Sequence, residues 1–464
     1  ERGNYMTTGS VYLSVIKKER NLGYKGKNVQ VVPDIPLEVI SRIKLAADKE
    51  DADVTTVEIG GTVGEYENIL FLEAVRMMKL EAPADVAVAL VSYLPVPGSI
   101  GEMKTKPTQH ASRTLNSAGV FADVILARAP VPLDEKRKEK IATFCNVRKD
   151  RVISAPDVES IYDVPLNFEK DNLSGILCDV LSLKPKKNPA GLRAWKSFVA
   201  TTKHSKGEVK IAIAGKYFKS GEFILSDVYM SVIEALKFSS YAAGVKPTIE
   251  YLNTKDFEGP KANLSVLDGY DGIIVPGGFG ETGIEGKIRV IEYARTRKIP
   301  YFGLCYGMQL MTVEYARNAA GLAGANTTEI DPNTKHPIIA ILPEQAEKLA
   351  KREYGGTMRL GTYPCKLQSG TIARDAYGVE KIDERHRHRY EVNPAYVAKL
   401  AEAGLVFSGV SPDQRLMEIA ELPRNVHPFF LGTQFHPELQ ARPLAPHPLF
   451  TRFIQASLAR RNKK

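Results

Sequence analysis

The sequence predicts an α/β protein with two parallel-sheet domains, and three observations support this class. Apolar runs of strand length alternate with helical patterns along most of the 464 residues. A basic, proline-containing stretch at 183–208 has little strand signal and interrupts the alternation. A second α/β series then begins with the run VKIAIAGKY. We therefore expect a first domain at 1–183, a linker at 184–208 and a second domain at 209–464.

Strands and helices alternate in the first domain in the manner of βαβ units. Helical periodicity predicts helices at 67–80 and 135–145. A short helical pattern also surrounds Trp195 in the linker. Apolar runs bounded by turn residues predict strands at 27–33, 54–60, 85–95, 122–129 and 150–155.

The second domain opens with a strand at 209–217 that ends near a glycine. A helical pattern follows at 226–244, with Asp227 near its start and Gly244 at its end, as is typical of helix termini. Further strand signals lie in 247–254, 271–280, 299–304, 415–422 and 428–439.

The composition excludes several classes of protein. With 44% hydrophobic and 25% charged residues, the chain has a globular composition, and no apolar run reaches the length of a membrane span. Its four cysteines lie far apart without a CxxC pair, which favours a reducing cytoplasm over a disulfide framework. The net charge is +9, but the basic residues do not form a stripe interleaved with aromatic residues. Acidic small molecules such as nucleotides therefore fit better than nucleic acid.

The sequence GLCYG places Cys305 between Gly303 and Gly307, directly after a predicted strand and before a helical pattern. Glycines on both sides allow a sharp strand-to-helix turn that exposes the side chain between them. A thiol at a helix N-terminus is favoured as thiolate. The alternative for a lone cysteine is a small buried packing residue.

A base for this thiol is available in the sequence QFHPEL. His436 and Glu438 are two residues apart, so the carboxylate can orient the imidazole and the imidazole can activate the sulfur. A glycine-rich loop at 275–287 follows a strand and can supply N–H groups to an oxyanion, although such loops often only reverse the chain. Together these features indicate acyl transfer through a thioester.

The sequences PGGFG, GLCYGMQ and QFHPE, in this order, resemble a class I glutamine amidotransferase domain over about 209–455. The resemblance implies a flavodoxin-like α/β fold in which Cys305 attacks the side-chain amide of glutamine. It implies that His436, oriented by Glu438, transfers the protons. The oxyanion hole would then consist of the N–H groups of Gly278 and Tyr306.

Attack on the glutamine amide would release ammonia, and two polar motifs in the first domain suggest which molecule accepts it. VEIGGTVGEYEN (57–68) offers glycines for close approach to phosphate and glutamates that can hold Mg²⁺ or hydroxyl groups. GEMKTKPTQH (101–110) offers two lysines as point charges for a triphosphate, in a short proline-containing loop. Each motif alone is also typical of a solvated turn.

Together these motifs resemble the CTP synthases, as do TTGSVY, IATFCNV, DVESIYDVP, GGTMRLG and ERHRHRYEVN. The resemblance covers essentially the whole chain and implies a P-loop-type amidoligase domain at the N-terminal end. It implies a glutamine-hydrolysing ligase of pyrimidine biosynthesis. In that reaction ATP phosphorylates the 4-oxygen of UTP, ammonia from glutamine passes through an internal tunnel, and the ammonia displaces phosphate to give CTP.

The same resemblance assigns binding residues. Glu58 would hold Mg²⁺, and Pro156, Asp157 and Val158 would lie near ATP. UTP or the feedback inhibitor CTP would contact Glu65, Tyr66, Glu67, Lys104, Thr105, Lys106, Pro107, Thr108, Gln109 and Lys140, where Tyr66 departs from the usual isoleucine. Glutamine would contact Gly278, Tyr306, Gly307, Met308, Gln309, Glu329 and Arg389. Arg389 suits the α-carboxylate as a bidentate partner.

Three further expectations follow from the resemblance. The loop at 354–361 would be the lid that responds to GTP, the activator, and the chain would form a homotetramer. The family's N-terminal strand and P-loop have no counterpart in the 464 residues, and no initiating Met is present. We therefore expect the sequence to be an N-terminally truncated piece that does not phosphorylate UTP as written. The alternative is a glutaminase-only or a non-catalytic regulatory or assembly relative.

Overall fold

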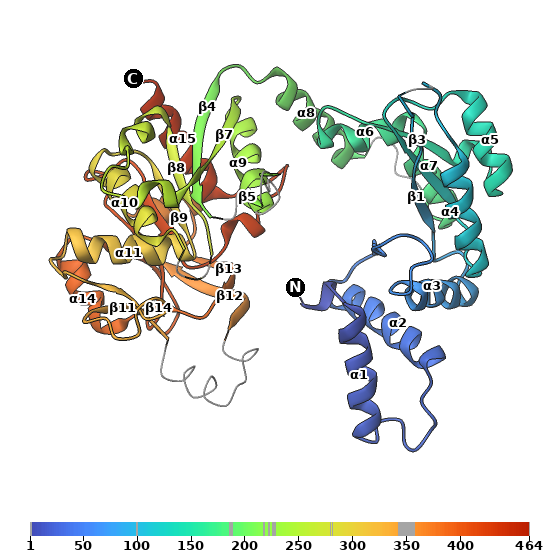
Figure 1. Cartoon of the computed structure of the whole chain (residues 1–464), viewed down its shortest axis with the longest axis horizontal. Coiled ribbons are helices and arrows are strands. Elements are labelled where there is room, and N and C mark those ends of the chain that lie inside the picture. The colour runs from blue at the N-terminus through green and yellow to red at the C-terminus, as the bar shows by residue number, and fades with distance from the viewer. Residues whose placement is uncertain are drawn as a thin grey trace. The chain divides into compact units, whose positions relative to one another are not determined.

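The computed structural model describes residues 2–98, 101–184, 189–216, 219–220, 223–224, 229–278, 280, 282–341 and 358–463. It divides into two compact units, Glu1–Arg193 and Ala194–Lys464 (Figure 1). Within these described ranges, no helix is both long and apolar enough to cross a membrane.

The first unit contains a three-stranded parallel sheet in the order β1-β2-β3. Leu94, Ile125 and Ile141 are fully buried in the core beside this sheet. Asp134 starts one of the covering helices, because its side chain accepts a hydrogen bond from the Arg137 N–H at 2.7 Å. The elements in chain order are α1 (Thr8–Arg20), α2 (Val31–Lys49), α3 (Ile69–Glu81), β1 (Ala89–Tyr93), α4 (Lys106–Ser117), β2 (Val124–Ala129), α5 (Glu135–Cys145), β3 (Val152–Pro156), α6 (Val164–Lys170) and α7 (Leu173–Val180), with short 3-10 turns at Arg2–Asn4, Lys149–Arg151 and Ile161–Asp163.

Two strands predicted for this unit are wrong. Residues 27–33 form an irregular segment and the start of α2, and 54–60 form no strand. In the second segment Val54 is 61% exposed and Val57 46% exposed, so its apolar residues cover no sheet face. A run of strand-forming residues becomes a strand only where a neighbour pairs with its backbone, and no described strand pairs with this one.

The second unit is built on a nine-stranded sheet in the order β13-β12-β15-β16-β17-β9-β8-β4-β7. The five strands from β17 to β7 run parallel, and the four at the other end pair antiparallel. The strands are β4 (Glu208–Gly215), β7 (Lys246–Asn253), β8 (Gly272–Val275), β9 (Tyr301–Leu304), β12 (Arg359–Leu367), β13 (Lys381–His388), β15 (Val406–Val410), β16 (Met417–Glu421) and β17 (Phe430–Thr433).

The remaining elements complete the second unit. The helices are α8 (Ala190–His204), which begins in the last residues of the first unit, α9 (Met230–Ala242), α10 (Ile284–Thr296), α11 (Tyr306–Asn318), α13 (Ile372–Tyr377), α14 (Pro394–Glu402) and α15 (Pro448–Arg461). Smaller strands are β5 (Lys219–Ser220), β6 (Phe223–Ile224), β10 (Asn326–Thr327), β11 (Pro337–Ala340) and β14 (Glu391–Val392), and 3-10 turns lie at Thr254–Phe257, Leu264–Gly269 and Pro437–Leu439.

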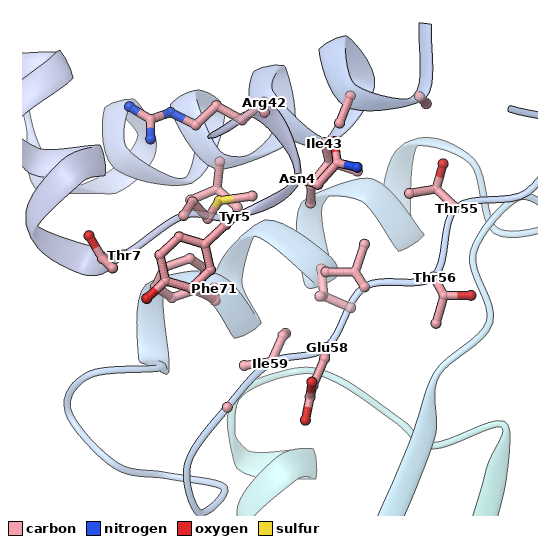
Figure 2. A pocket seen from close by; sticks show the side chains of 18 of the residues that line it. Asn4, Tyr5, Thr7, Arg42, Ile43, Thr55, Thr56, Glu58, Ile59 and Phe71 are labelled. Carbon is pink, nitrogen blue, oxygen red and sulfur yellow. The ribbon is translucent and has the colours of Figure 1, made fainter. Parts of the chain in front are cut away.

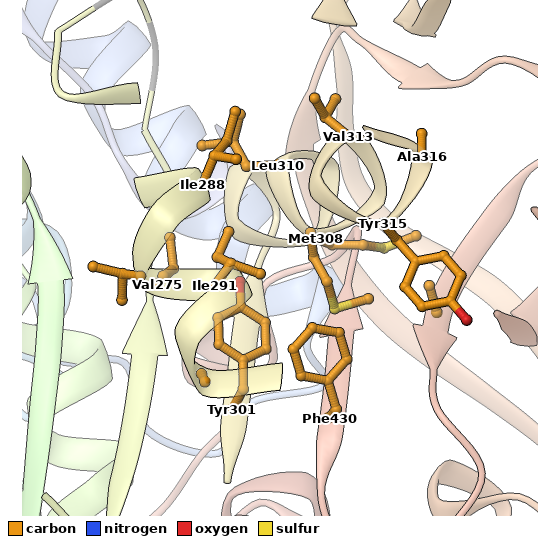
Figure 3. Packing of buried hydrophobic residues seen from close by; sticks show 14 of the residues in the cluster. Val275, Ile288, Ile291, Tyr301, Met308, Leu310, Val313, Tyr315, Ala316 and Phe430 are labelled. Carbon is orange, nitrogen blue, oxygen red and sulfur yellow. The ribbon is translucent and has the colours of Figure 1, made fainter. Parts of the chain in front are cut away.

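The apolar sides of α10 and α11 pack on the parallel part of the sheet (Figure 3). Ile291 from α10, Met308 from α11 and Phe430 from β17 are fully buried there. The ring centroids of Tyr301 and Phe430 lie 4.9 Å apart. This packing fixes α11 over β9 and β17, and thereby fixes the position of the residue that joins β9 to α11.

The predicted α/β fold class is confirmed, since the first unit carries a parallel sheet and the second a mixed sheet whose five strands from β17 to β7 run parallel, each with helices around it. The strand and helix predicted around Cys305 are found as β9 and α11. The predicted linker contains a helix of 15 residues, α8.

Candidate active site

Three neighbouring strands bring the predicted catalytic segments together. β8, β9 and β17 are adjacent and parallel, so their carboxyl ends lie at one edge of the sheet. The glycine-rich loop follows β8, Cys305 follows β9, and His436 lies shortly after β17. Sequence spacing could not show that these segments meet, but this strand order places them side by side.

Cys305 occupies a strained strand-to-helix turn. Its φ of 51° and ψ of −99° are unusual for a residue with a side chain, and it directly precedes α11. A Cβ on Gly307 would overlap the carbonyl oxygen of Val275, and a Cβ on Gly303 would lie 2.7 Å from the Gly307 carbonyl carbon. Both glycines are therefore needed for this turn. Cys305 therefore lies at the N-terminus of α11, where the first backbone N–H groups of a helix have no partner within the helix.

His436 and Glu438 form a hydrogen-bonded pair, with Nδ1 of the imidazole 2.7 Å from Oε1 of the carboxylate. Burial disfavours a charged imidazole here, but the charges of Glu438 and Cys305 outweigh it and hold the pKa of His436 well above its usual value. A Cβ on Gly277 would lie 3.0 Å from Cε1 of His436 and 3.7 Å from Cβ of Cys305. The imidazole and the thiol therefore both border the first glycine of the loop.

A chain of buried amides leads to the sulfur. Gln434 donates from Nε2 to the Cys305 sulfur at 3.8 Å, and its Oε1 accepts from Nε2 of Gln309 at 3.3 Å. The same Gln309 nitrogen donates to the Tyr390 carbonyl at 2.9 Å. Gln434 is the first residue of the motif QFHPEL, but its residue type and position there did not predict a role. Its complete burial could not be read from the sequence.

The glycine-rich loop is held at Gly280 from both sides of the peptide chain. The Gly280 N–H donates to Oε1 of Glu329 at 3.0 Å. Its carbonyl oxygen accepts from Nζ of Lys216 and from the Tyr306 hydroxyl, both at 3.4 Å. Glu329 and Tyr306, both predicted to bind glutamine, are thus tied to the loop that contains Gly278.

The charges of Arg389 and Glu329 both affect the pKa of Tyr390. Burial raises the pKa of Tyr390, the Glu329 carboxylate raises it further, and the Arg389 guanidinium lowers it. A carboxylate and a guanidinium are therefore available near one ring. The side chain of Met308 is fully buried against Gly432, so a glutamine contact at Met308 can come only from its backbone.

His386 and His388 lie in a buried network behind this site. Nδ1 of His386 is 2.9 Å from Nε2 of His388. Burial, together with the charges of Arg359 and His436, lowers the pKa of His388 to about 3. Arg359 pairs with Glu418 at 2.8 Å and lies 3.7 Å from Glu391. These groups come from β12, β13, β16 and the two-residue strand β14.

In the first unit, a cavity of about 850 Å³ is lined by Glu58 and Glu67. Figure 2 shows Thr55, Thr56 and Glu58 on the segment along one side of this cavity and Arg42 on α2 along the other. Glu58 and Glu65 are exposed, and Tyr66 is 94% exposed. Within the described ranges no cluster of three or more His, Cys, Asp or Glu side chains is arranged to hold a metal ion.

The segment 104–109 is only partly a loop. Lys106 to Gln109 form the first turn of α4, because Pro107 suits the start of a helix. Thr108 is fully buried and accepts a hydrogen bond from Ser92 at 2.9 Å, while Gln109 donates to Thr105 at 3.1 Å. The hydroxyl and amide predicted to face a nucleotide are therefore satisfied within the protein, and Lys104 and Lys106 are the more accessible groups.

The other nucleotide-site candidates lie at the carboxyl ends of β1, β2 and β3. The Lys104 N–H donates to the Pro95 carbonyl at 2.9 Å, and the Asp157 N–H donates to the Ala129 carbonyl at 2.9 Å. Open α/β sheets bind ligands at this edge. Lys104 pairs with Glu102 at 2.7 Å, and the Lys104 hydrogen bond lowers the pKa of Glu102.

Lys140 on α5 adds to this positive potential, because its charge also lowers the pKa of Glu102. Pro156 is the last residue of β3, and Val158 follows two residues later. Of the predicted lid at 354–361, residues 354–357 lie outside the described residues, and 359–361 begin β12.

The fold and this site define a class I glutamine amidotransferase domain. The model of the family described as "Glutamine amidotransferase class-I" matches residues 224–456, and that described as "CTP synthase N-terminus" matches residues 1–183. The chain is 48% identical to the CTP synthase of Halalkalibacterium halodurans over 461 residues, which is 98% of the chain and 84% of the relative. The chain belongs to the CTP synthase family and is thus a glutamine-hydrolysing ligase with nucleotide substrates.

Two further comparisons agree. The CTP synthase of Thermococcus kodakarensis is 48% identical over 454 residues, covering 97% of the chain and 82% of the relative. The glutaminase domain of the Trypanosoma brucei CTPS, solved with bound acivicin, superposes with a TM-score of 0.50 at 36% identity. It covers 54% of the chain and 94% of that domain.

Proposed function

We propose that Cys305, His436 and Glu438 hydrolyse glutamine to supply the ammonia of the CTP synthase reaction. The observation that carries this proposal is the strained backbone of Cys305 between β9 and α11. The neighbouring strand β17 leads to His436 and Glu438, whose imidazole and carboxylate lie 2.7 Å apart. A purely structural cysteine would need neither the unfavourable backbone nor the adjacent base.

The reaction has two halves. His436 takes the proton of the Cys305 thiol, and the thiolate attacks the amide carbon. The carbonyl electrons move to the oxygen, which accepts hydrogen bonds from the N–H groups of Gly278 and Tyr306. The imidazolium of His436 gives its proton to the amide nitrogen, so that ammonia leaves and a thioester remains. Water then attacks the thioester, His436 takes its proton, and glutamate departs as the thiol is restored.

The glutamine substrate is held for this attack through its α-ammonium and α-carboxylate groups. The Glu329 carboxylate binds the α-ammonium, and the Arg389 guanidinium binds the α-carboxylate. Their common influence on Tyr390 supports this pairing. Gly307, Met308 and Gln309 contribute through their backbone, since the side chains of Met308 and Gln309 are buried.

The first unit binds the nucleotides at the carboxyl edge of its sheet. Lys104, Lys106 and Lys140 bind the phosphates of UTP or CTP, and Glu65 to Glu67 contact the pyrimidine nucleotide. The segment Pro156 to Val158 borders ATP. Glu58 fits a Mg²⁺ site as one carboxylate ligand, because Mg²⁺ commonly takes one or two carboxylates with phosphates and water. When bound, Mg²⁺ supplies neutralising charge for the transferred phosphoryl group.

We extend the proposal to regulation and assembly on the basis of family membership. We assign GTP as the activator of glutamine hydrolysis, CTP as the feedback inhibitor and a cytoplasmic homotetramer as the working form. The four cysteines are free thiols, which supports a reducing compartment. Sedimentation with and without nucleotides measures the assembly.

Glutamate release by the whole chain tests the catalytic assignment. Cys305→Ala is expected to abolish it, whereas Cys365→Ala, at another buried cysteine of the same unit, should retain it. Equal activity in the wild type and the Cys305→Ala variant would overturn the proposal.

A further inference from the structure

A lysine is completely buried beneath the glycine-rich loop of the second unit. Lys287 lies in the first turn of α10 and has no exposed surface. Among the described residues, its Nζ has no hydrogen-bond partner. An ammonium group is rarely buried without a partner, because the lost hydration is not replaced. Lysine side chains are long and usually extend until the ammonium reaches water. The burial of this ammonium therefore needs an explanation.

The ammonium is directed at the two residues proposed to form the oxyanion hole. Nζ lies 3.8 Å from the position that a Cβ on Gly278 would take. It also lies 5.1 Å from the centroid of the Tyr306 ring, within the range of a cation–π contact. Gly278 and Tyr306 therefore share this cation as a neighbour, although they come from different strand ends.

The charges around Lys287 leave the loop positive. Lys216, buried at the end of β4, donates to the Gly280 carbonyl, and the Glu329 carboxylate accepts from the Gly280 N–H. Burial and, to a lesser extent, the charge of Lys216 lower the pKa of Lys287 to about 7, although the Glu329 carboxylate partly offsets them. At neutral pH Lys287 is therefore only partly protonated, beside the Lys216 cation and the Glu329 carboxylate. A negative charge arriving at the loop would favour the protonated form of Lys287 and would be stabilised by it.

We propose that Lys287 is a positioning residue for glutamine hydrolysis, whose buried ammonium behind Gly278 and Tyr306 stabilises the negative oxygen formed when Cys305 attacks the amide. This inference rests on the function proposed above. The carbon–sulfur bond forms as the carbonyl electrons move to oxygen, and the proton for the departing nitrogen comes from His436. Lys287 transfers no proton and forms no bond.

This role differs from a packing role in its effect on stability. A lysine that served only the core would be more costly to bury than an apolar side chain of the same length, so Lys287→Met should keep or raise the melting temperature. The same variant removes the positive charge from the oxyanion hole and should lower kcat. Loss of activity with gain of stability is the pattern of a charge retained for catalysis.

The test uses the whole chain and compares Lys287→Met with Lys287→Arg and with the control Arg289→Met on the same helix. Arg289 hydrogen-bonds the carbonyls of Phe257 and Gly259 and lies outside the site. We expect Lys287→Met to lower kcat for glutamate release by about tenfold or more with little change in KM. Its melting temperature should be no lower than that of the wild type. Lys287→Arg should retain more activity, and Arg289→Met should keep the wild-type kcat.

A second measurement, inhibition by an aldehyde analogue of glutamine, tests the stabilisation of the negative oxygen separately from turnover. L-Glutamate γ-semialdehyde adds a thiol to give a tetrahedral adduct, so its inhibition constant should rise in parallel with the loss of kcat. If Lys287→Met does not fold, the neutral Lys287→Gln gives the same comparison. A wild-type kcat in the neutral variants, or a loss confined to KM or to the folded fraction, overturns the inference. Activity in Cys305→Ala would instead overturn the proposed function.

Discussion

Nδ1 of His436 and Oε1 of Glu438 lie 2.7 Å apart at the end of β17, with a single proline between the two residues in the chain. This contact fixes the tautomer that directs the other imidazole nitrogen toward its reaction partner. The imidazole is also held by its own backbone, since the His436 N–H donates to the Arg385 carbonyl at 2.8 Å.

Glu438→Gln should lower kcat for glutamine hydrolysis by about 10²–10⁴-fold. The carboxylate raises the pKa of His436, so its removal lowers that pKa. The imidazolium needed to protonate the leaving nitrogen is then lost at a lower pH, and the alkaline limit of activity should move downward. A pH–rate profile checks this shift, with the exposed Glu402→Gln as control. An unmoved alkaline limit would contradict the assignment.

Gly307→Ala should disrupt the turn at Cys305, because the new Cβ would overlap the Val275 carbonyl. We expect a loss of about 2–5 kcal/mol in the free energy of unfolding, together with loss of glutamate release. Gly259→Ala is the matched control, since a Cβ there meets nothing within 4 Å. Denaturant titration measures both variants. Equal denaturation midpoints for the Gly307→Ala and Gly259→Ala variants would show that the turn tolerates a side chain.

Glu391→Gln should change how stability depends on pH. Burial and the charge of Glu418 raise the pKa of Glu391 well above its usual value, and Arg359 only partly offsets them. The folded chain therefore binds more protons than the unfolded chain, and this group's contribution falls as pH rises from about 4.5 through the folded pKa. The melting temperature of the variant minus that of the wild type should therefore be larger at pH 8 than at pH 5. An equal difference at both pH values would contradict this reasoning.

Lys104→Ala should weaken UTP binding by about tenfold while leaving glutamate release intact. The lysine lies on a loop anchored to Pro95, so its removal should not disturb the sheet. Titration calorimetry with UTP measures the effect, and Lys149→Ala on the same unit is the control. Unchanged UTP affinity would remove Lys104 from the nucleotide site.

The sequence predicted the local structure around Cys305 better than the strands of the first unit. The elbow at Cys305 was predictable because glycine spacing, strand and helix all act locally. The segments 27–33 and 54–60 were not, since a strand also needs a partner that local pattern does not reveal. The sequence around Pro107 predicts a loop, but proline equally suits the first turn of a helix.

Burial of polar groups was the other property that the sequence did not show. Lys287 stands at the end of the quoted glycine-rich segment, and a lysine there would ordinarily be exposed. Gln434 and Thr108 are likewise fully buried. Such placement depends on strands far apart in the chain, so residue type and spacing could not reveal it.

The central claim is that Cys305 is the nucleophile, and the mass of the chain after reaction with an electrophilic glutamine analogue, such as a diazoketone, tests it most directly. The predicted result is one adduct per chain, mapped by proteolysis to Cys305 and prevented by excess glutamine. Labelling at Cys145, Cys178 or Cys365 instead, or labelling that glutamine does not prevent, would contradict the account.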